Sequence, residues 1–114
     1  MTTDPAAFRN EVLLSLQRAL WDLVTPGLRA VAVRLSYPLI DARLMYEAVG
    51  SVERELVSEV ESYVVADFLP PVDVRFAAVE VPPGEQRELE AGEEWVYRRR
   101  EGEPWVTSDG TASC

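Results

Sequence analysis

The fold follows from one stretch, Val52-Glu-Arg-Glu-Leu-Val-Ser-Glu-Val-Glu-Ser-Tyr-Val-Val-Ala-Asp-Phe68, which predicts an amphipathic helix. Residues spaced three and four apart share one side of a helix, and here they are Val52, Leu56, Val60, Tyr63, Val64 and Asp67. We expect Ser51 to be the N-cap, with Glu53 and Glu55 near the positive end of the helix dipole. The prolines after Leu69 end the helix. A helix with one apolar side needs a layer to pack on, and the flanking segments have the pattern of strands.

The length and composition indicate one small domain over residues 1–101, followed by a disordered tail over residues 102–114. A chain of 114 residues with 47% apolar residues can bury a core. No apolar run approaches the roughly 18 residues that span a bilayer, and we expect no secretory signal at the N-terminus. The single cysteine, Cys114, is the last residue and cannot form an internal disulfide. A cytoplasmic location is therefore expected.

The charge balance limits the classes of partner. There are 20 acidic residues against 11 basic ones, all of them arginine, and the formal net charge is −9. An acidic surface repels phosphate backbones, so we expect no nucleic-acid partner, and no membrane partner is indicated. The same charge speeds encounter with a basic protein, although it also serves solubility alone.

The N-terminal region predicts another helix. Asp4 is a suitable N-cap before a proline, and the helix is expected to run from Pro5 to Val24. Its buried stripe is Phe8, Val12, Leu13, Leu16, Ala19, Leu20, Leu23 and Val24. Leu14 and Trp21 lie on another flank. They are either a contact site for a second chain or, for Trp21, a cover over the sheet edge or the tail.

Four segments alternate apolar and polar residues as half-buried strands do: Leu28–Tyr37, Ala42–Glu47, Val72–Val81 and Glu94–Arg100. The short connection between the first two favours an antiparallel hairpin. The alternation slips at Ala77-Ala78, which predicts a bulge or a bend. In the last segment Trp95 and Tyr97 are expected on one face, opposite Val96.

These elements predict an α+β fold with two layers. The order is helix-strand-strand-helix-strand-strand, with a mostly antiparallel four-stranded sheet and both helices on one face. The other face carries Arg, Ala, Ser and Glu residues, and we expect it to be partly open to solvent or to a partner.

The residues available for chemistry argue against an enzyme. Histidine is absent, the only cysteine lies in the tail, and no glycine-rich phosphate loop is present. Glu55 and Glu59 share one side of the helix and could hold a hard cation. No further oxygen ligands accompany them at a defined spacing, so they are better explained as a solvated helix face. We expect no metal site and no cofactor.

Two acidic segments remain as candidate contact regions. Glu80–Glu94 holds six acids and one arginine, for a local charge of −5, and includes Glu85, Glu88 and Glu90. Glu47–Asp67 likewise holds six acids and one arginine, again −5. Such patches could mimic a phosphate backbone and cap a basic active site.

Three stretches resemble a family of small, largely uncharacterised bacterial proteins. They are Leu16-Gln-Arg-Ala-Leu-Trp-Asp-Leu-Val-Thr-Pro-Gly-Leu-Arg-Ala-Val-Ala-Val33, Ser58-Glu-Val-Glu-Ser-Tyr-Val-Val-Ala-Asp-Phe68 and Trp95-Val-Tyr-Arg-Arg-Arg-Glu101. Some members are similar to immunity proteins of contact-dependent growth inhibition and polymorphic-toxin systems. The resemblance implies a non-catalytic protein that occludes a cognate toxin, often a nuclease. It carries over no functional residues, and the family's Tyr-Tyr-Asp-Gly turn is only partly kept in Tyr46-Glu-Ala-Val-Gly50.

Two hypotheses follow. In the first, the chain is an immunity-like binding protein, and its contact residues are Trp21, Glu55, Glu59, Glu85, Glu88 and Glu90. In the second, it is a structural domain without a toxin partner, or a homodimer formed through the open sheet face. Binding to a toxin distinguishes the first, and a concentration-dependent mass the second.

Overall fold

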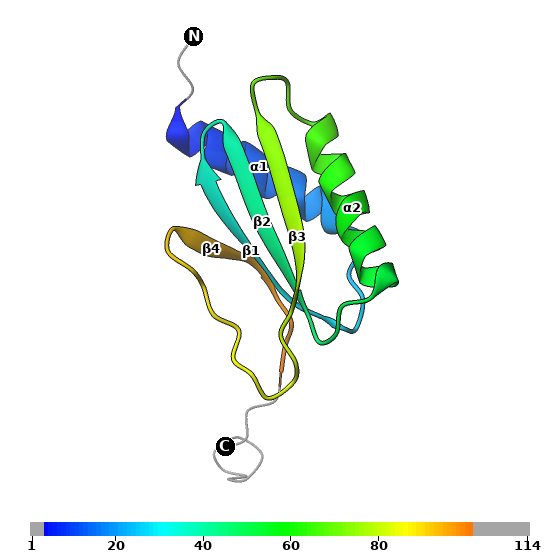
Figure 1. The fold of residues 1–114 in the computed structure, drawn as a ribbon. Coiled ribbons are helices and arrows are strands. Elements are labelled where there is room, and N and C mark those ends of the chain that lie inside the picture. The colour runs from blue at the N-terminus through cyan, green and yellow to red at the C-terminus, as the bar shows by residue number, and fades with distance from the viewer. Residues whose placement is uncertain (1–3, 102–114) are drawn as a thin grey trace.

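A computed structural model describes residues 4–101 and contains the predicted order of elements (Figure 1). The elements are α1 (Pro5–Leu20), β1 (Leu28–Ser36), β2 (Leu39–Tyr46), α2 (Ser51–Ala66), β3 (Asp73–Glu80) and β4 (Glu93–Arg98). The predicted α+β class, element order and β1–β2 hairpin are confirmed. The disorder expected for residues 102–114 concerns a segment outside the described residues.

The sheet is mixed, with the strand order β3-β2-β1-β4. β1 pairs antiparallel with β2 and with β4, but β2 and β3 are parallel. The prediction of a mostly antiparallel sheet was therefore wrong. The reason is the connection: α2 carries the chain back along β2 before β3 begins, as in any strand–helix–strand crossover, so the two strands run the same way.

Both helices pack on one face of the sheet, where the main core lies. From α1 this core takes Phe8, Val12, Leu16, Ala19 and Leu20, as predicted. The helix ends at Leu20 rather than at Val24, because Trp21 leaves the helical conformation and Asp22 has a positive φ of 66°. Val24 is 41% exposed, so its predicted place in the buried stripe was wrong.

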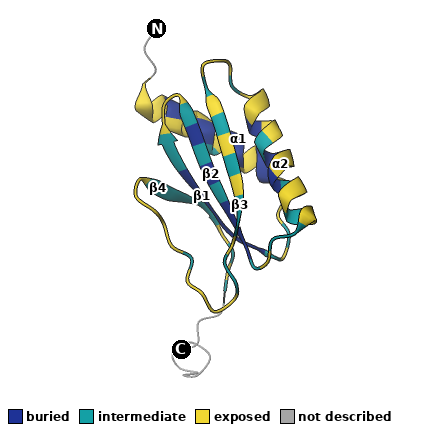
Figure 2. Ribbon diagram, in the orientation of Figure 1, coloured by how far each residue is buried: buried dark blue, intermediate teal, exposed yellow. Residues whose placement is uncertain are grey.

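The buried side of α2 differs from the predicted one. Val57, Val60 and Val64 are buried, whereas Val52 and Tyr63 are largely exposed. The observed set and the predicted set both have the spacing of one helix face. The orientation of α2 places the three valines, and not Tyr63, against the sheet. Figure 2 shows this division along α2. The N-cap is Gly50 rather than Ser51, and Glu53 accepts the Gly50 N–H at 2.8 Å.

The irregularities of the strands also lie elsewhere than predicted. β3 pairs with β2 in an unbroken register through Ala77 and Ala78, so no bulge occurs there. The register shifts instead in β1 at Arg29 and in β4 at Val96. The shift at Val96 separates the two aromatic residues of β4: Tyr97 packs against the main core and Trp95 against the other face. The prediction that Trp95 and Tyr97 share one face was wrong, because Val96 is an extra, unpaired residue between them.

The second face of the sheet is covered in part and is otherwise open, as predicted, since Asp73 and Arg75 of β3 are exposed there. Ala30, Ala32 and Met45 are buried there, with Val81 and Trp95 packed against them. The strand order explains this cover. The chain must pass from β3 at one edge to β4 at the other, and the connecting segment Pro82–Gly92, here called the acidic loop, runs past one end of the strands to the start of β4 (Figure 1).

At its outer edge β3 lies against α2. The backbone N–H of Phe76 donates to the carboxylate of Glu61 at 2.9 Å. Within residues 4–101, neither helix has the length and apolar content needed to cross a bilayer.

Candidate partner-binding surfaces

The acidic loop is held by Arg29, which the bulge in β1 directs toward it. Leu28 pairs with Tyr46 and Ala30 with Met45, so Arg29 is the extra residue between the two pairs. An extra residue of this kind turns its side chain out of the strict alternation. The Arg29 side chain is only 5% exposed.

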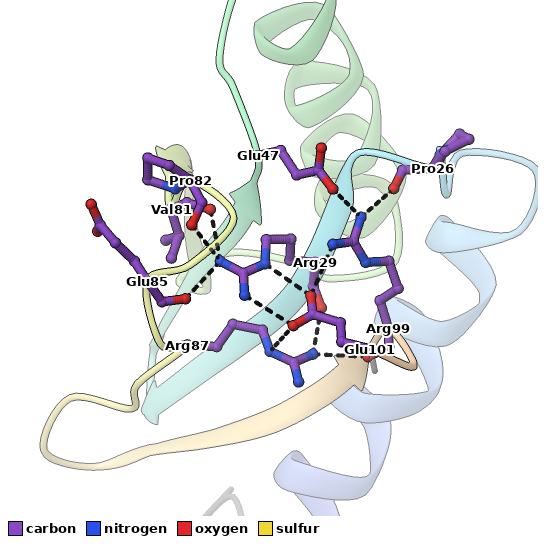
Figure 3. Close-up of polar contacts among 9 residues, drawn as sticks. All are labelled: Pro26, Arg29, Glu47, Val81, Pro82, Glu85, Arg87, Arg99 and Glu101. Atoms are coloured by element: carbon purple, nitrogen blue, oxygen red, sulfur yellow. Dashed lines mark hydrogen bonds and ion pairs between the residues drawn. The ribbon is translucent and has the colours of Figure 1, made fainter. Parts of the chain in front are cut away.

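Every nitrogen of the Arg29 guanidinium has a partner (Figure 3). Nη1 donates to three carbonyl oxygens at 2.8–3.0 Å, those of Val81, Pro82 and Glu85. Nε and Nη2 donate to the carboxylate of Glu101 at 2.8 and 2.9 Å. One nearly buried cation thus joins the start of the acidic loop to the chain just after β4.

Two more arginines complete what we call the Arg29 cluster, defined as Arg29, Arg87, Arg99 and Glu101. Arg87 donates to the carbonyl oxygens of Arg29 and Arg99. Arg99 donates to Glu101 and also to Glu47 in the turn after β2. The hydrogen bonds from Arg29 lower the pKa of Glu101 to about 2, against the opposing effect of burial.

A second clamp holds the end of the acidic loop. Arg43 forms two hydrogen bonds of 2.6 and 2.7 Å with Glu93, whose side chain is 3% exposed. Arg43 also donates to the carbonyl of Glu88, and Glu93 accepts the backbone N–H of Glu90. The hydrogen bond with Arg43 lowers the pKa of Glu93. The loop is therefore tied to the sheet at both ends.

The acidic loop presents carboxylates to solvent while its carbonyl groups bind arginines. Glu85, Glu88 and Glu90 are all exposed. Glu90 lies 3.8 Å from Arg43, and the side chains of Glu85 and Glu88 form no ion pair within residues 4–101. These three predicted residues therefore lie together on the acidic loop, on the side of the second face of the sheet.

The other three predicted residues lie on the helix side. Trp21, directly after α1, is 70% exposed, and Glu55 and Glu59 are exposed on α2. An exposure of 70% contradicts the alternative in which Trp21 covers the sheet edge; the alternative of contact with the tail concerns residues that are not described. The six predicted residues thus form two groups on opposite sides of the sheet.

Two shallow hollows mark the helix side. One lies between the helices and is lined by Glu11, Leu14, Ser15, Arg18, Asp67 and Phe68. In it, Asp67 accepts a hydrogen bond from Ser15 at 2.6 Å and lies 3.4 Å from Arg18. The other is lined by Glu59, Ser62, Tyr63 and Ala66. Among residues 4–101, no three acidic, histidine or cysteine side chains are grouped to hold a metal ion.

Sequence reasoning missed several residues of these surfaces. The alternation of β1 gives no sign that Arg29 would hold the acidic loop. Tyr63 was expected in the core but is 58% exposed. The acidic loop covers part of the sheet face proposed for a homodimer, and Ala30, Ala32 and Met45 on that face were a signal that this part would be covered.

Comparison with known proteins identifies one family. The family model described as MafI2 immunity protein matches residues 9–101, which span all but the first turn of α1 and every later element. The predicted resemblance to toxin-immunity proteins is confirmed. No curated protein matches the chain.

Proposed function

The chain belongs to the MafI2 immunity protein family, and we propose that it binds and neutralises a cognate protein toxin in the cytoplasm. The observation that carries this proposal is the family match over residues 9–101. We propose further that the protein acts by occluding the toxin and performs no catalysis.

The chemistry of the described residues supports a binding role. Histidine is absent from the whole sequence. The two carboxylates with lowered pKa values, Glu93 and Glu101, are paired with arginines that hold the acidic loop. A general base must be able to take up a proton from a substrate near neutral pH, and a carboxylate whose charged form is stabilised by arginine is a poor one.

The charge supports a basic target. A net charge of −9 with exposed glutamates on both sides of the sheet attracts a cationic surface and accelerates association. Nucleases need such a surface because they bind phosphate. We therefore propose a nuclease as the target class, with the acidic protein blocking the path of the nucleic acid.

The test needs the cognate toxin, and we propose that it is encoded beside the gene for this chain. Expressed alone, the toxin should stop growth of a host bacterium, and co-expression of this chain should restore growth. A toxin of the same class from an unrelated gene pair is the matched control and should remain lethal. The purified pair should associate with a Kd on the order of nanomolar. Absence of both protection and association would overturn the proposal, and self-association alone would favour the homo-oligomeric alternative.

A further inference from the structure

We propose that the toxin docks on the helix side of the molecule, and that the toxin face seated there is basic. This inference rests on the proposed immunity function and adds the surface that performs it. We define the helix-side surface by its exposed apolar residues Leu14, Trp21, Val52 and Tyr63 and its exposed acids Glu55 and Glu59.

The apolar residues of this surface are unusually exposed. Trp21 is 70% exposed, Val52 60%, Tyr63 58% and Leu14 56%. Large aromatic side chains gain free energy when they leave water, and Trp and Tyr are the residues that most often dominate binding energy in protein interfaces. Two of them on one side of a small acidic protein give that side the anchors that a tight complex needs.

Leu14 and Tyr63 line the two hollows of the helix side. Leu14 lines the hollow between the helices together with Asp67 and Phe68. Tyr63 lies about one turn before Asp67 on α2 and lines the neighbouring hollow with Glu59. Trp21 follows Leu14 by seven residues and is the C-cap of α1, directly after its last residue. The hollows are shallow, which suits the face of a protein better than a small molecule.

The charge of the surface defines its occupant. Glu55 and Glu59 form no ion pair within the described part of the chain, so their charges are available to a partner. The arginine between the helices, Arg18, is already within 3.4 Å of Asp67. A partner that buries Trp21 and Tyr63 would therefore meet unneutralised carboxylates, and arginine or lysine side chains would complement them.

Within the described residues, the acidic loop does not combine exposed aromatic residues with unpaired carboxylates, as the helix-side surface does. Its one large exposed apolar residue is Leu89, at 42%, and it has no exposed aromatic residue. Its carbonyl groups at Val81, Pro82, Glu85 and Glu88 accept hydrogen bonds from Arg29 and Arg43. We assign the loop the role of covering the sheet, and its exposed carboxylates contribute to long-range attraction.

The experiment measures the affinity of matched variants for the purified toxin encoded beside the gene. Trp21→Ala and Tyr63→Ala should each weaken binding on the order of 30-fold, the size of effect typical of interface hot spots. Glu55→Gln combined with Glu59→Gln should slow association and reduce its dependence on salt. The loop variants Leu89→Ala and Glu88→Gln are the controls and should stay within about threefold of the unmodified protein. Circular dichroism and urea denaturation establish that each variant is folded.

The outcomes separate the two proposals. If the unmodified chain fails to bind the toxin, the immunity function itself is overturned. If it binds, and Trp21→Ala and Tyr63→Ala bind equally well while a loop variant loses affinity, the helix-side assignment falls and the immunity function stands. Since Trp21 and Tyr63 are more than half exposed, their replacement by alanine leaves the core intact, and weaker binding reports contact with the toxin.

Discussion

Replacing Glu101 by glutamine tests whether the Arg29 cluster stabilises the fold. The substitution keeps the shape and one acceptor oxygen but removes the charge that faces Arg29, whose side chain is 5% exposed. The pKa of Glu101 is lowered from 4.5 to about 2 in the folded protein. At a pH above the unfolded pKa, this shift corresponds to at most about 3 kcal/mol of unfolding free energy. Because the side chain is 18% exposed, water screens part of this, and we expect a loss of about 2 kcal/mol at neutral pH.

The pH dependence gives the sharper result. The folded pKa of Glu101 lies below its unfolded value, so its contribution is complete above about pH 5 and is lost as the pH falls toward about 2. The difference in unfolding free energy between the unmodified protein and Glu101→Gln should therefore shrink with acidification across this range. Other titrating carboxylates, including Glu93, are common to both proteins and cancel in the difference.

The assay is urea denaturation followed by circular dichroism at several pH values. Glu88→Gln is the matched control, because Glu88 is exposed and its carboxylate forms no hydrogen bond or ion pair within residues 4–101; it should change stability by less than about 0.5 kcal/mol. Our account of the cluster would be refuted by a Glu101→Gln protein as stable as the control, or by a difference that is the same at acidic and neutral pH.

Three further substitutions test the rest of the framework by the same urea assay. Arg43→Met should lower the free energy of unfolding by about 3 kcal/mol, because it leaves the nearly buried Glu93 carboxylate without its cation. Adding Glu93→Leu should recover much of that loss, because it removes the unpaired charge. If the double variant is no more stable than Arg43→Met alone, an unpaired charge is not the cause of the loss. Leu44→Ala, at a fully buried position of the main core, should cost about 3 kcal/mol through lost apolar contact and the cavity left behind, and a loss below about 1 kcal/mol would contradict the packing described.

The order of helices and strands could be predicted because it depends on local spacing. The steps from Phe8 to Val12 and Leu16 define α1, and the alternation of Val31 and Val33 defines β1. The pairing of β2 with β3 depends instead on which strands become neighbours, and the spacing of apolar residues does not contain that information. A helix between two strands was nevertheless a signal for a parallel crossover, and the prediction did not use it.

The candidate surface was predictable where the helix pattern was unambiguous. Trp21 lies off the apolar stripe predicted for α1 and is exposed. A contact site for a second chain, the first of the two interpretations of Trp21, needs this exposure. On α2, Tyr63 and Val57 each fit a stripe that contains Val60, and only packing against the sheet decides between them. Arg29 escaped prediction because its direction depends on a bulge opposite Met45, a feature of strand pairing rather than of the sequence nearby.

The hydrogen bond from Phe76 to Glu61 has a consequence for the behaviour of the protein in a concentrated solution. β3 is an outer strand, and free N–H groups on such a strand invite strands from other molecules to add, which is a route to aggregates. Here a carboxylate from the adjacent helix already accepts an N–H at the middle of the edge. A second strand adding there would have to displace a charged acceptor and approach the negative charge of Glu61. The parallel edge of the sheet is thus protected from fibril-like growth by a residue of α2.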